Sequence, residues 1–480
     1  MGSFYSLEIG KKALLAQRLG LDVTSNNIAN VNTPGYSRRS AVINETSPIK
    51  SNGQYVGTGS QVGLLRNFRQ ELLDKEIRNS TAQVQNYTIE QELYQKIDAV
   101  LGEPSDNGIN ELTTSFLTAF NQVSINPEDI ATRQYLMEQG HTLAERLNAT
   151  ANEMTEIRND IKLTLSQELT KANQLLVDIA NLNNNIVNSN AQSNNAAHTY
   201  IDERANKIEE LSKMFNVNVA YNEDGSANLF INGTNIITNQ NASELRLSES
   251  INSVTSERTL EIIKFNPATE SSTLVLPQSG QVASYLKFYN VVLDDKESTN
   301  GFSITKSLDE FTNALAQSVN SKTINGYGLN DKSAIPAGRS FFEPSAGFVS
   351  AALIKLSGDI KDKPEDIPLS SMSNEPGNNK VALDIARILE DRSFLDGQNP
   401  TEYYSNFLGK VSFATAEATN GLNNSKMINT QIETQRESLI GVNLDEEAVN
   451  LIKFQKAFEA SSRVINTANE MMNTIINLGL

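Results

Sequence analysis

A hydrophobic pattern that persists at helical spacing for about sixty residues constrains the fold of this chain more than any other feature. Its apolar positions are Leu136, Leu143, Leu147, Ile157, Ile161, Leu165, Leu169, Leu176, Ile179, Leu182 and Ile186. A helix of this length would measure about 90 Å at about 1.5 Å per residue. Few compact domains accommodate such a rod, whereas long coiled coils do, and Gly140 is its one visible weak point. We expect Asn126 to cap this helix and Pro127 to occupy its first position.

Helices with a seven-residue apolar repeat are also predicted near both ends of the chain. Such a repeat is typical of an a/d seam and favours packing of one helix on another. We therefore predict an assembly interface made by Leu7, Leu14, Leu21, Ile28, Leu444, Leu451, Phe454, Phe458, Ile465, Met472 and Ile475. In a lone subunit these stripes are expected to lack a partner, because isolated helices bury too little apolar surface to offset the entropy of ordering.

Local signals predict where the first helix ends and the last helix begins. The first should end near Asn30, because the Pro34-Gly35 turn that follows cannot continue it. Asn443 is a suitable cap for the last helix, and the carboxylate of Glu446 stands where it can reach back to the N–H group of the cap. Residues 445–447 are all acidic, which suits the positive end of the helix dipole.

The remainder of the chain is predicted to follow the order helix, β insert, helix. Further helices are expected over residues 69–101, 109–123, 201–215, 282–293 and 304–324, and from 381 to the C-terminus. Alternating patterns and turn signals predict strands between 217 and 276 and short strands between 36 and 63. The expected fold class is mainly α with a β insert (α+β), with the N- and C-terminal helices paired in coiled-coil layers and a β-rich domain inserted between them.

Composition excludes several classes of function. The net charge of −17 argues against nucleic acid as a partner, since phosphate binding needs clustered Lys and Arg. The chain has no Cys and only two His, His141 and His198, which lie far apart. We therefore predict no catalytic, cofactor-binding or metal-binding residues and no enzymatic activity. No stretch approaches the roughly 18 consecutive apolar residues that membrane insertion requires.

Two motifs, one near each end, resemble those of the bacterial flagellar axial family of rod, hook and hook-associated proteins. The first motif comprises Ser25, Asn26, Asn27, Ile28, Asn30, Pro34, Gly35 and Tyr36. The second comprises Val442, Asn443, Leu444, Asp445, Glu446 and Glu447. Two separated motifs in the right order form a specific signal. The interior segments 126–134, 200–204 and 325–328 are similar to those of the hook-associated members.

The resemblance implies a structural subunit at the junction between the hook and the filament of the bacterial flagellum. It implies secretion by the flagellar type III system without a cleaved signal peptide, and assembly through the terminal helices. The implied partners are further copies of the chain in a ring, the hook protein, the second junction protein and an export chaperone on the C-terminal helix. No nucleic acid is expected among the partners.

The resemblance and the helix pattern together predict four parts. Residues 1–35 and 441–480 are expected to form an inner layer of assembly helices, and residues 36–200 and 378–440 a helical coiled-coil domain. Residues 201–325 are expected to form a β-rich outer domain with flanking helices. Residues 326–377 are expected to form a short variable segment.

Two alternatives stay open on the sequence alone. A hook or distal-rod subunit would share the end motifs, although the interior match and the long helix after Pro127 argue against it. An extracellular adhesin with coiled-coil stalks would also combine helices, a β insert and no Cys, but it would not account for the paired end motifs. A secreted hydrolase would need a catalytic cluster, which the sequence lacks.

Overall fold

The computed structural model describes residues 2–33, 35–51, 54–102, 107–191, 197–251, 258–266, 270–294, 302–344 and 347–478. It is 62% helical and 15% strand, with small sheets inserted between the terminal helices, which confirms the predicted fold class. The contacts divide the chain into two units. The first contains residues 1–81, 173–243 and 426–480, and the second contains residues 82–172 and 244–425. The four predicted domain boundaries stay a prediction.

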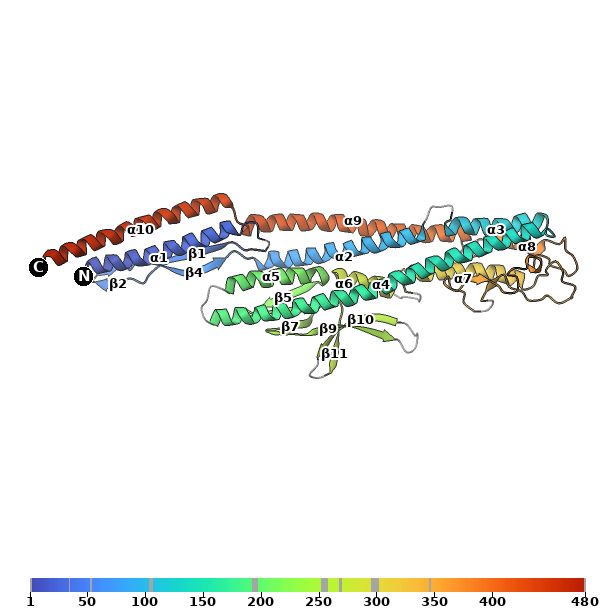
Figure 1. Ribbon diagram of the computed structural model, residues 1–480, viewed down its shortest axis with the longest axis horizontal. Coiled ribbons are helices and arrows are strands. Elements are labelled where there is room, and N and C mark those ends of the chain that lie inside the picture. The colour runs from blue at the N-terminus through green and yellow to red at the C-terminus, as the bar shows by residue number, and fades with distance from the viewer. Residues whose placement is uncertain are drawn as a thin grey trace. The chain divides into compact units, whose positions relative to one another are not determined.

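Two long helices and a β ribbon form the terminal part of the first unit. Helix α1 (Gly2–Ala29) lies beside helix α10 (Leu444–Leu478) (Figure 1). The antiparallel strands β1 (Arg39–Glu45) and β4 (Ser60–Asn67) pack against α1, and the short hairpin of β2 (Ile49–Ser51) and β3 (Gln54–Val56) lies between them in sequence. Because α1 packs on α10 within one chain, the expectation that the terminal stripes lack a partner in a lone subunit is wrong.

A four-stranded antiparallel sheet completes the first unit. It follows helix α5 (Ala197–Met214), and its strands β5 (Val217–Tyr221), β6 (Ala227–Ile231), β7 (Thr234–Thr238) and β8 (Asn241–Ala242) are paired in sequence order. The buried Asn183 holds this sheet to the last part of helix α4 (Ile130–Ala191). Its Nδ2 donates to the carbonyl oxygen of Ala227 at 2.8 Å, and its Oδ1 accepts from the N–H group of the same residue at 3.1 Å. The predicted hairpin zone is confirmed.

Helices dominate the second unit. They are the last part of α2 (Glu71–Leu101), α3 (Ile109–Ile125), most of α4, α6 (Gln281–Lys287) with its π turn η1 (Phe288–Val292), α7 (Ile304–Thr323), α8 (Lys380–Ala386) with its 3-10 turn η3 (Arg387–Glu390), and most of α9 (Pro400–Ile440). Phe116, Phe120, Phe341 and Phe342 are fully buried, and the centroids of the rings in contact lie 5.0–5.6 Å apart. The helical region predicted from 381 onward consists of separate helices, because non-helical residues separate α8 with η3 from α9, and α9 from α10; the last helix begins after Asn443, as predicted.

A three-stranded antiparallel sheet in the second unit has the order β11-β10-β9. Its strands are β9 (Glu244–Ile251), β10 (Arg258–Asn266) and β11 (Ser271–Val275). The side chain of Asn290 in η1 exchanges hydrogen bonds with the backbone of Leu260, at 2.8 and 2.9 Å, and so attaches the central strand to the helices. A two-residue pairing of β12 (Phe342–Glu343) with β13 (Lys355–Leu356) and the 3-10 turn η2 (Pro364–Asp366) lie in the following loop region.

The long helix begins later than the sequence predicted. Its first residue is Ile130, and Asp129 caps it by accepting hydrogen bonds from the N–H groups of Ala131 and Thr132 at 3.3 and 3.1 Å. Asn126 instead opens a turn that the N–H group of Asp129 closes at 3.1 Å, so the predicted cap at Asn126 is wrong. The negative charge of Asp129 is also favourable at the positive end of the helix dipole.

Gly140 does not break the long helix. A Cβ atom at this position would lie 2.6 Å from the ring of Phe341 and 3.1 Å from the ring of Phe116. Glycine therefore allows the aromatic core to approach the helix backbone, which explains why this residue interrupts the apolar pattern without interrupting the helix. A lipid bilayer could not be spanned by any helix in the described part of the chain, because none has the necessary length and apolarity together.

Candidate functional site: a clasp between the first and last helices

The two end motifs meet at an ion pair between Arg38 and the start of α10. The Nε atom of Arg38 donates to Oε1 of Glu447 at 2.8 Å, and its Nη1 atom donates to Oε2 of Glu446 at 3.1 Å. The side chain of Glu447 is only 2% exposed, whereas that of Glu446 is 57% exposed. A buried carboxylate is stable only when it is paired and hydrogen-bonded, so Arg38 makes burial of Glu447 possible.

Asn27 connects this ion pair to the turn that follows α1. Its Nδ2 donates to Oε2 of Glu447 at 3.0 Å and to the carbonyl oxygen of Arg39 at 2.8 Å. Its Oδ1 accepts from the hydroxyl of Tyr36 at 2.8 Å and from the N–H group of Arg39 at 3.1 Å. Asn27 is only 1% exposed, and its side-chain amide makes two hydrogen bonds as a donor and two as an acceptor. We call Asn27, Tyr36, Arg38, Arg39, Glu446 and Glu447 the end clasp.

The end clasp changes the role that the sequence suggested for the acidic residues. Asn443 caps α10 as predicted, because its Oδ1 accepts from the N–H groups of Asp445 and Glu446 at 2.9 and 3.3 Å. The carboxylate of Glu446, which was expected to reach back to the cap, binds Arg38 instead. An ion pair with a guanidinium is stronger than a bond to a neutral N–H group.

Small residues allow α1 and α10 to approach closely. A Cβ atom on Gly10 would lie 2.8 Å from Ile465, and one on Gly20 would lie 2.7 Å from the ring of Phe454. Ala16 on α1 and Ala468 on α10 are also buried. The contact is therefore made by large side chains of α10 that rest against glycines of α1.

Two of the predicted interface residues, Phe454 and Ile465, make this contact. Most of the predicted residues are half-buried in the single chain: Leu7, Leu14, Leu21, Ile28, Leu451, Phe454, Phe458, Ile465 and Met472. Leu444 and Ile475 are 51% and 59% exposed. Their role between subunits stays a prediction, because only one chain is present.

The remaining family-motif residues surround the end clasp. Ser25, Asn26, Gly35, Asn443 and Asp445 are exposed, and Ile28, Asn30 and Val442 are half-buried. Asn30 donates from Nδ2 to the carbonyl oxygen of Asn26 at 2.9 Å, which ends the helix locally. Pro34 lies outside the described residues.

Sequence reasoning missed Asp202, which ties the end clasp to α5. Its Oδ2 accepts from Nη2 of Arg39 at 2.8 Å, and Nη1 of Arg69 lies 3.7 Å from its Oδ1. Two positions on, Arg204 donates to Oδ1 of Asn183 and to the carbonyl oxygen of Gly225, both at 2.7 Å. The segment 200–204 was identified only through its family resemblance. The residues that it binds lie far away in the sequence, and no local pattern indicates them.

Charge and burial set the protonation of the end clasp. Burial lowers the pKa of Arg38, but the hydrogen bond to Glu446 and the charge of Glu447 outweigh it and raise the pKa above its ordinary value. Burial raises the pKa of Tyr36, which Arg39 partly opposes, so the hydroxyl stays a donor to Asn27. Burial, followed by the charge of Arg39, lowers the pKa of His198.

Large apolar side chains on the same two helices remain uncovered. Those at least 45% exposed are Phe4, Leu15, Leu444, Val449, Ile452, Val464, Met471, Ile475 and Ile476, and we call them the terminal apolar surface. The end clasp therefore holds together two helices that carry exposed apolar side chains.

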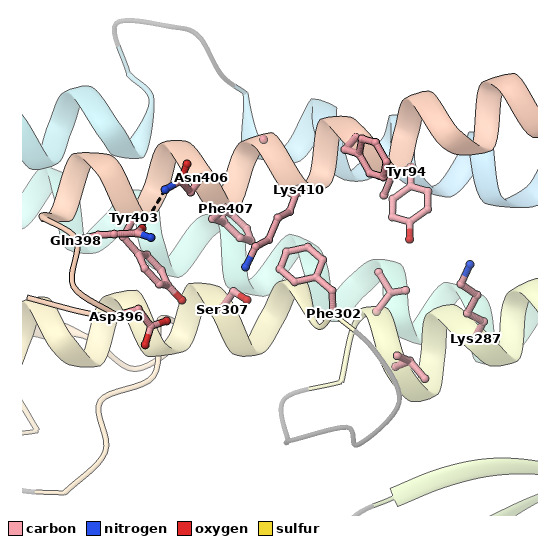
Figure 2. Close-up of a pocket in the computed structure, with 15 residues that line it drawn as sticks. Tyr94, Lys287, Phe302, Ser307, Asp396, Gln398, Tyr403, Asn406, Phe407 and Lys410 are labelled. Carbon is pink, nitrogen blue, oxygen red and sulfur yellow. Dashed lines mark hydrogen bonds between the residues drawn. The ribbon is translucent and has the colours of Figure 1, made fainter.

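The second unit contains a cavity of about 850 Å³ between α7, α9 and η1 (Figure 2). Phe302 and Phe407 line it, with ring centroids 6.1 Å apart, and the Lys410 ammonium lies 5.5 Å from the ring of Phe302. Burial and the charge of Glu310 raise the pKa of Tyr403 in its wall to about 12. Within the described ranges, no three His, Cys, Asp or Glu side chains are grouped to hold a metal ion.

Three family models of flagellar components match separate parts of the chain. The model described as the flagellar hook-associated protein FlgK helical domain matches residues 94–342. The model of the flagellar basal body rod FlgEFG protein C-terminal region matches residues 435–478, and that of the flagella basal body rod protein matches residues 7–36. The two shorter matches contain most of the residues of the end clasp.

Individual relatives show the same similarity along their full length. Flagellar hook-associated protein 1 of Bacillus subtilis is 23% identical over 508 residues, which cover 99% of this chain and 98% of the relative. The protein of the same name from Escherichia coli is 22% identical over 553 residues, covering 97% and 98%. The solved structure of the flagellar hook junction protein FlgK from Burkholderia pseudomallei has a TM-score of 0.64 at 13% identity, and covers 76% of this chain and 100% of that one.

Proposed function

The chain belongs to the family of the flagellar hook-associated protein FlgK, and we propose that it is a structural subunit of the junction between the hook and the filament. The observation that carries this proposal is the match to relatives named flagellar hook-associated protein 1 over 97–99% of the chain. The rod-family matches at the two ends are compatible with a hook or rod subunit as well. The interior match to the helical domain favours the hook-associated assignment over that alternative.

The mechanism of assembly that we propose rests on the end clasp. Arg38, Asn27 and Glu447 hold α10 against α1, so the terminal apolar surface is offered by two ordered helices rather than by a loose chain end. Copies of the subunit would bury this surface against one another and against neighbouring flagellar proteins in a ring. Such a contact joins different patches on successive subunits. It therefore produces a closed ring only when the rotations from one subunit to the next add up to a full turn.

The partners follow from the same proposal. The hook protein would contact the subunit on one side of the ring and the second junction protein on the other. Before assembly, a chaperone would cover the apolar side chains of α10, because exposed apolar surface of this extent promotes aggregation. Secretion would use the flagellar type III channel.

Deletion of the gene tests the proposed function. We expect electron microscopy to show hooks without filaments, and flagellin to accumulate in the medium. Absence of hooks as well would replace the proposal with a rod or hook function, and normal filaments would refute both.

Complementation of the deletion strain tests the role of the terminal helices. Leu451→Asp and Ile465→Asp place a carboxylate at half-buried positions of the predicted seam and should fail to restore filaments, because a carboxylate buried without a partner costs several kcal/mol. Val449→Asp changes the terminal apolar surface and should also fail, although its α1–α10 pair stays folded. Asn466→Asp, at an exposed polar position, is the matched control and should restore filaments.

A further inference from the structure

The hairpin of β6 and β7 turns through two residues, Asn232 and Gly233. Ile231 and Thr234 pair on either side of this turn. The φ angles are 45° at Asn232 and 81° at Gly233, and positive φ at both central residues defines a type I′ turn, for which Asn-Gly is a preferred sequence. Both residues are exposed. The turn therefore presents an Asn-Gly pair to water.

An exposed Asn-Gly pair can react with itself, and Asn is a thermolabile residue for this reason. The backbone nitrogen of Gly233 attacks Cγ of Asn232, and the new C–N bond closes a succinimide ring. The side-chain amide nitrogen leaves as ammonia with the proton of the Gly233 N–H group. Water then opens the ring at one of its carbonyl groups and leaves an aspartyl or an isoaspartyl residue. Glycine favours the attack because it has no Cβ atom to hinder it.

Hydrogen bonds do not restrain the two reacting groups of this turn. Within the described residues, no hydrogen bond is made by the side-chain amide of Asn232 or by the N–H group of Gly233. A Cβ atom on Gly233 would meet nothing within 4 Å, so the glycine is not covered by a neighbouring side chain. Exposed turns with few contacts open locally at little cost in free energy. The tip can therefore rotate to bring the nitrogen towards Cγ without disturbing buried residues.

The other Asn-Gly pairs within the described residues are held differently. The pair 420–421 lies inside α9, where the helix fixes the backbone and uses its N–H groups. In the pair 325–326 the N–H group of the glycine donates to the carbonyl oxygen of Thr323 at 2.9 Å. In the pair 107–108 the glycine is buried. Each of these pairs must break or expose more structure than the tip of the hairpin before it can react.

A second turn of the same sheet separates the effect of glycine from that of exposure. Asn239 begins the turn between β7 and β8, has a φ angle of 54° and is exposed, as Asn232 is. The residue that follows it is Gln240, whose Cβ atom hinders the attack. The Oδ1 atom of Asn239 also accepts a hydrogen bond from Nδ2 of Asn222 at 3.0 Å. Asn239 should therefore persist under conditions in which Asn232 reacts.

We propose that Asn232 is a site of spontaneous deamidation, and that the folded structure selects it among the described Asn-Gly pairs. The reaction adds a negative charge at the tip of the hairpin. The isoaspartyl product also inserts a methylene group into the backbone of a turn that sets the register of β6 and β7. The reaction needs only the turn and water, so it does not depend on the proposed function.

Incubation of the folded chain in mildly alkaline buffer, followed by digestion and fragment mass spectrometry, tests this proposal. We expect Asn232 to convert faster than Asn325 and Asn420 by roughly tenfold or more, because the turn opens more easily than a helix or a hydrogen-bonded loop. Asn239 should stay intact over the same period. In guanidinium, where the fold is lost, the three Asn-Gly pairs should convert at rates within about twofold of one another.

Two matched variants test the role of the glycine. Gly233→Asn adds a Cβ atom to the attacking residue, which should slow conversion of Asn232 by roughly tenfold, and Asn tolerates the positive φ angle. Gly338→Asn makes the same change at another exposed glycine, which has a φ angle of 71° and open space around it, and should leave the rate at Asn232 unchanged.

Four outcomes would overturn the proposal. The first is an unmodified Asn232 in the folded chain, and the second is conversion of Asn239 at the same rate. The third is a ranking of the three Asn-Gly pairs that is the same in the folded chain and in guanidinium, since the fold would then not select the site. The fourth is equal slowing of the reaction by both glycine variants.

Discussion

Arg38 and Glu447, which are 409 positions apart in the sequence, form a hydrogen-bonded ion pair in which the carboxylate is almost fully buried. Removal of the Glu447 carboxylate takes one acceptor from the buried Asn27 amide and leaves Arg38 paired only with the exposed Glu446, which costs about 1–3 kcal/mol. We therefore expect Glu447→Ala to lower the melting temperature of the α1–α10 pair, measured by hydrogen exchange during heating. Glu446→Ala is the control, since its exposed carboxylate should contribute no more than about 1 kcal/mol. Equal effects of both substitutions would contradict the account.

The close approach of α1 and α10 predicts an unusual response to alanine. Gly20→Ala should destabilise the pair by about 1–3 kcal/mol, because the added Cβ atom would lie 2.7 Å from the ring of Phe454. Gly409→Ala in α9 meets nothing within 4 Å and should stabilise the chain by about 1 kcal/mol through helix propensity. Chemical denaturation followed by circular dichroism distinguishes the two. A stabilising Gly20→Ala would show that the helices do not touch there.

We predict that protonation of His198 lowers the free energy of unfolding in mild acid. Burial, and then the charge of Arg39, lower its pKa in the folded chain below the ordinary value of 6.5. The unfolded chain therefore binds the proton first, and the free energy of unfolding falls as the pH drops from about 6.5 towards the folded pKa. Above that window the contribution of His198 is constant. Unfolding of a His198→Asn variant, measured across pH 5–8, should show a smaller decline than that of the parent chain, and an identical profile would rule out this source.

We predict that loss of the Asp129 cap destabilises the first turn of the long helix. Asp129→Ala removes the acceptor for two N–H groups and should cost about 0.5–2 kcal/mol, whereas Asn126→Ala should cost less because that residue does not cap the helix. Hydrogen exchange of the amides of residues 131–133 measures the difference. A larger effect at Asn126 would restore the cap that the sequence suggested.

Much of the fold could be predicted from the sequence because its helices carry regular apolar periods. The predicted ends of α2, α3 and α7 lie within two residues of the observed ones, since the residues that stop these helices are local. The break before α10 was predicted from the cap at Asn443, whereas the break before α9 was not. The segment before α9 is held by local turns, such as the bond from the N–H group of Phe394 to the carbonyl oxygen of Asp391.

The candidate site could be predicted only in part. The motifs that contain Asn27 and Glu447 were identified, but the acidic residues had a sufficient local explanation in the helix dipole, so nothing indicated their pairing with Arg38. The apolar repeat drew attention to the leucines of α1, whereas Gly10 and Gly20 make the closest approach to α10. Hydrophobic periodicity is detected from large apolar side chains. It therefore does not indicate a helix contact that is made possible by glycines.

The central claim is that the end clasp joins α1 and α10 into one element within a single chain. Hydrogen exchange with mass spectrometry on a verified monomer tests it most directly, with the parent chain and Glu447→Ala compared under the same conditions. We predict slow exchange in both α1 and α10 of the parent chain, lost from both helices together in the variant, while residues 400–425 of α9 keep their protection. Rapid exchange of both helices in the parent monomer, or loss of protection in α10 alone, would contradict the claim.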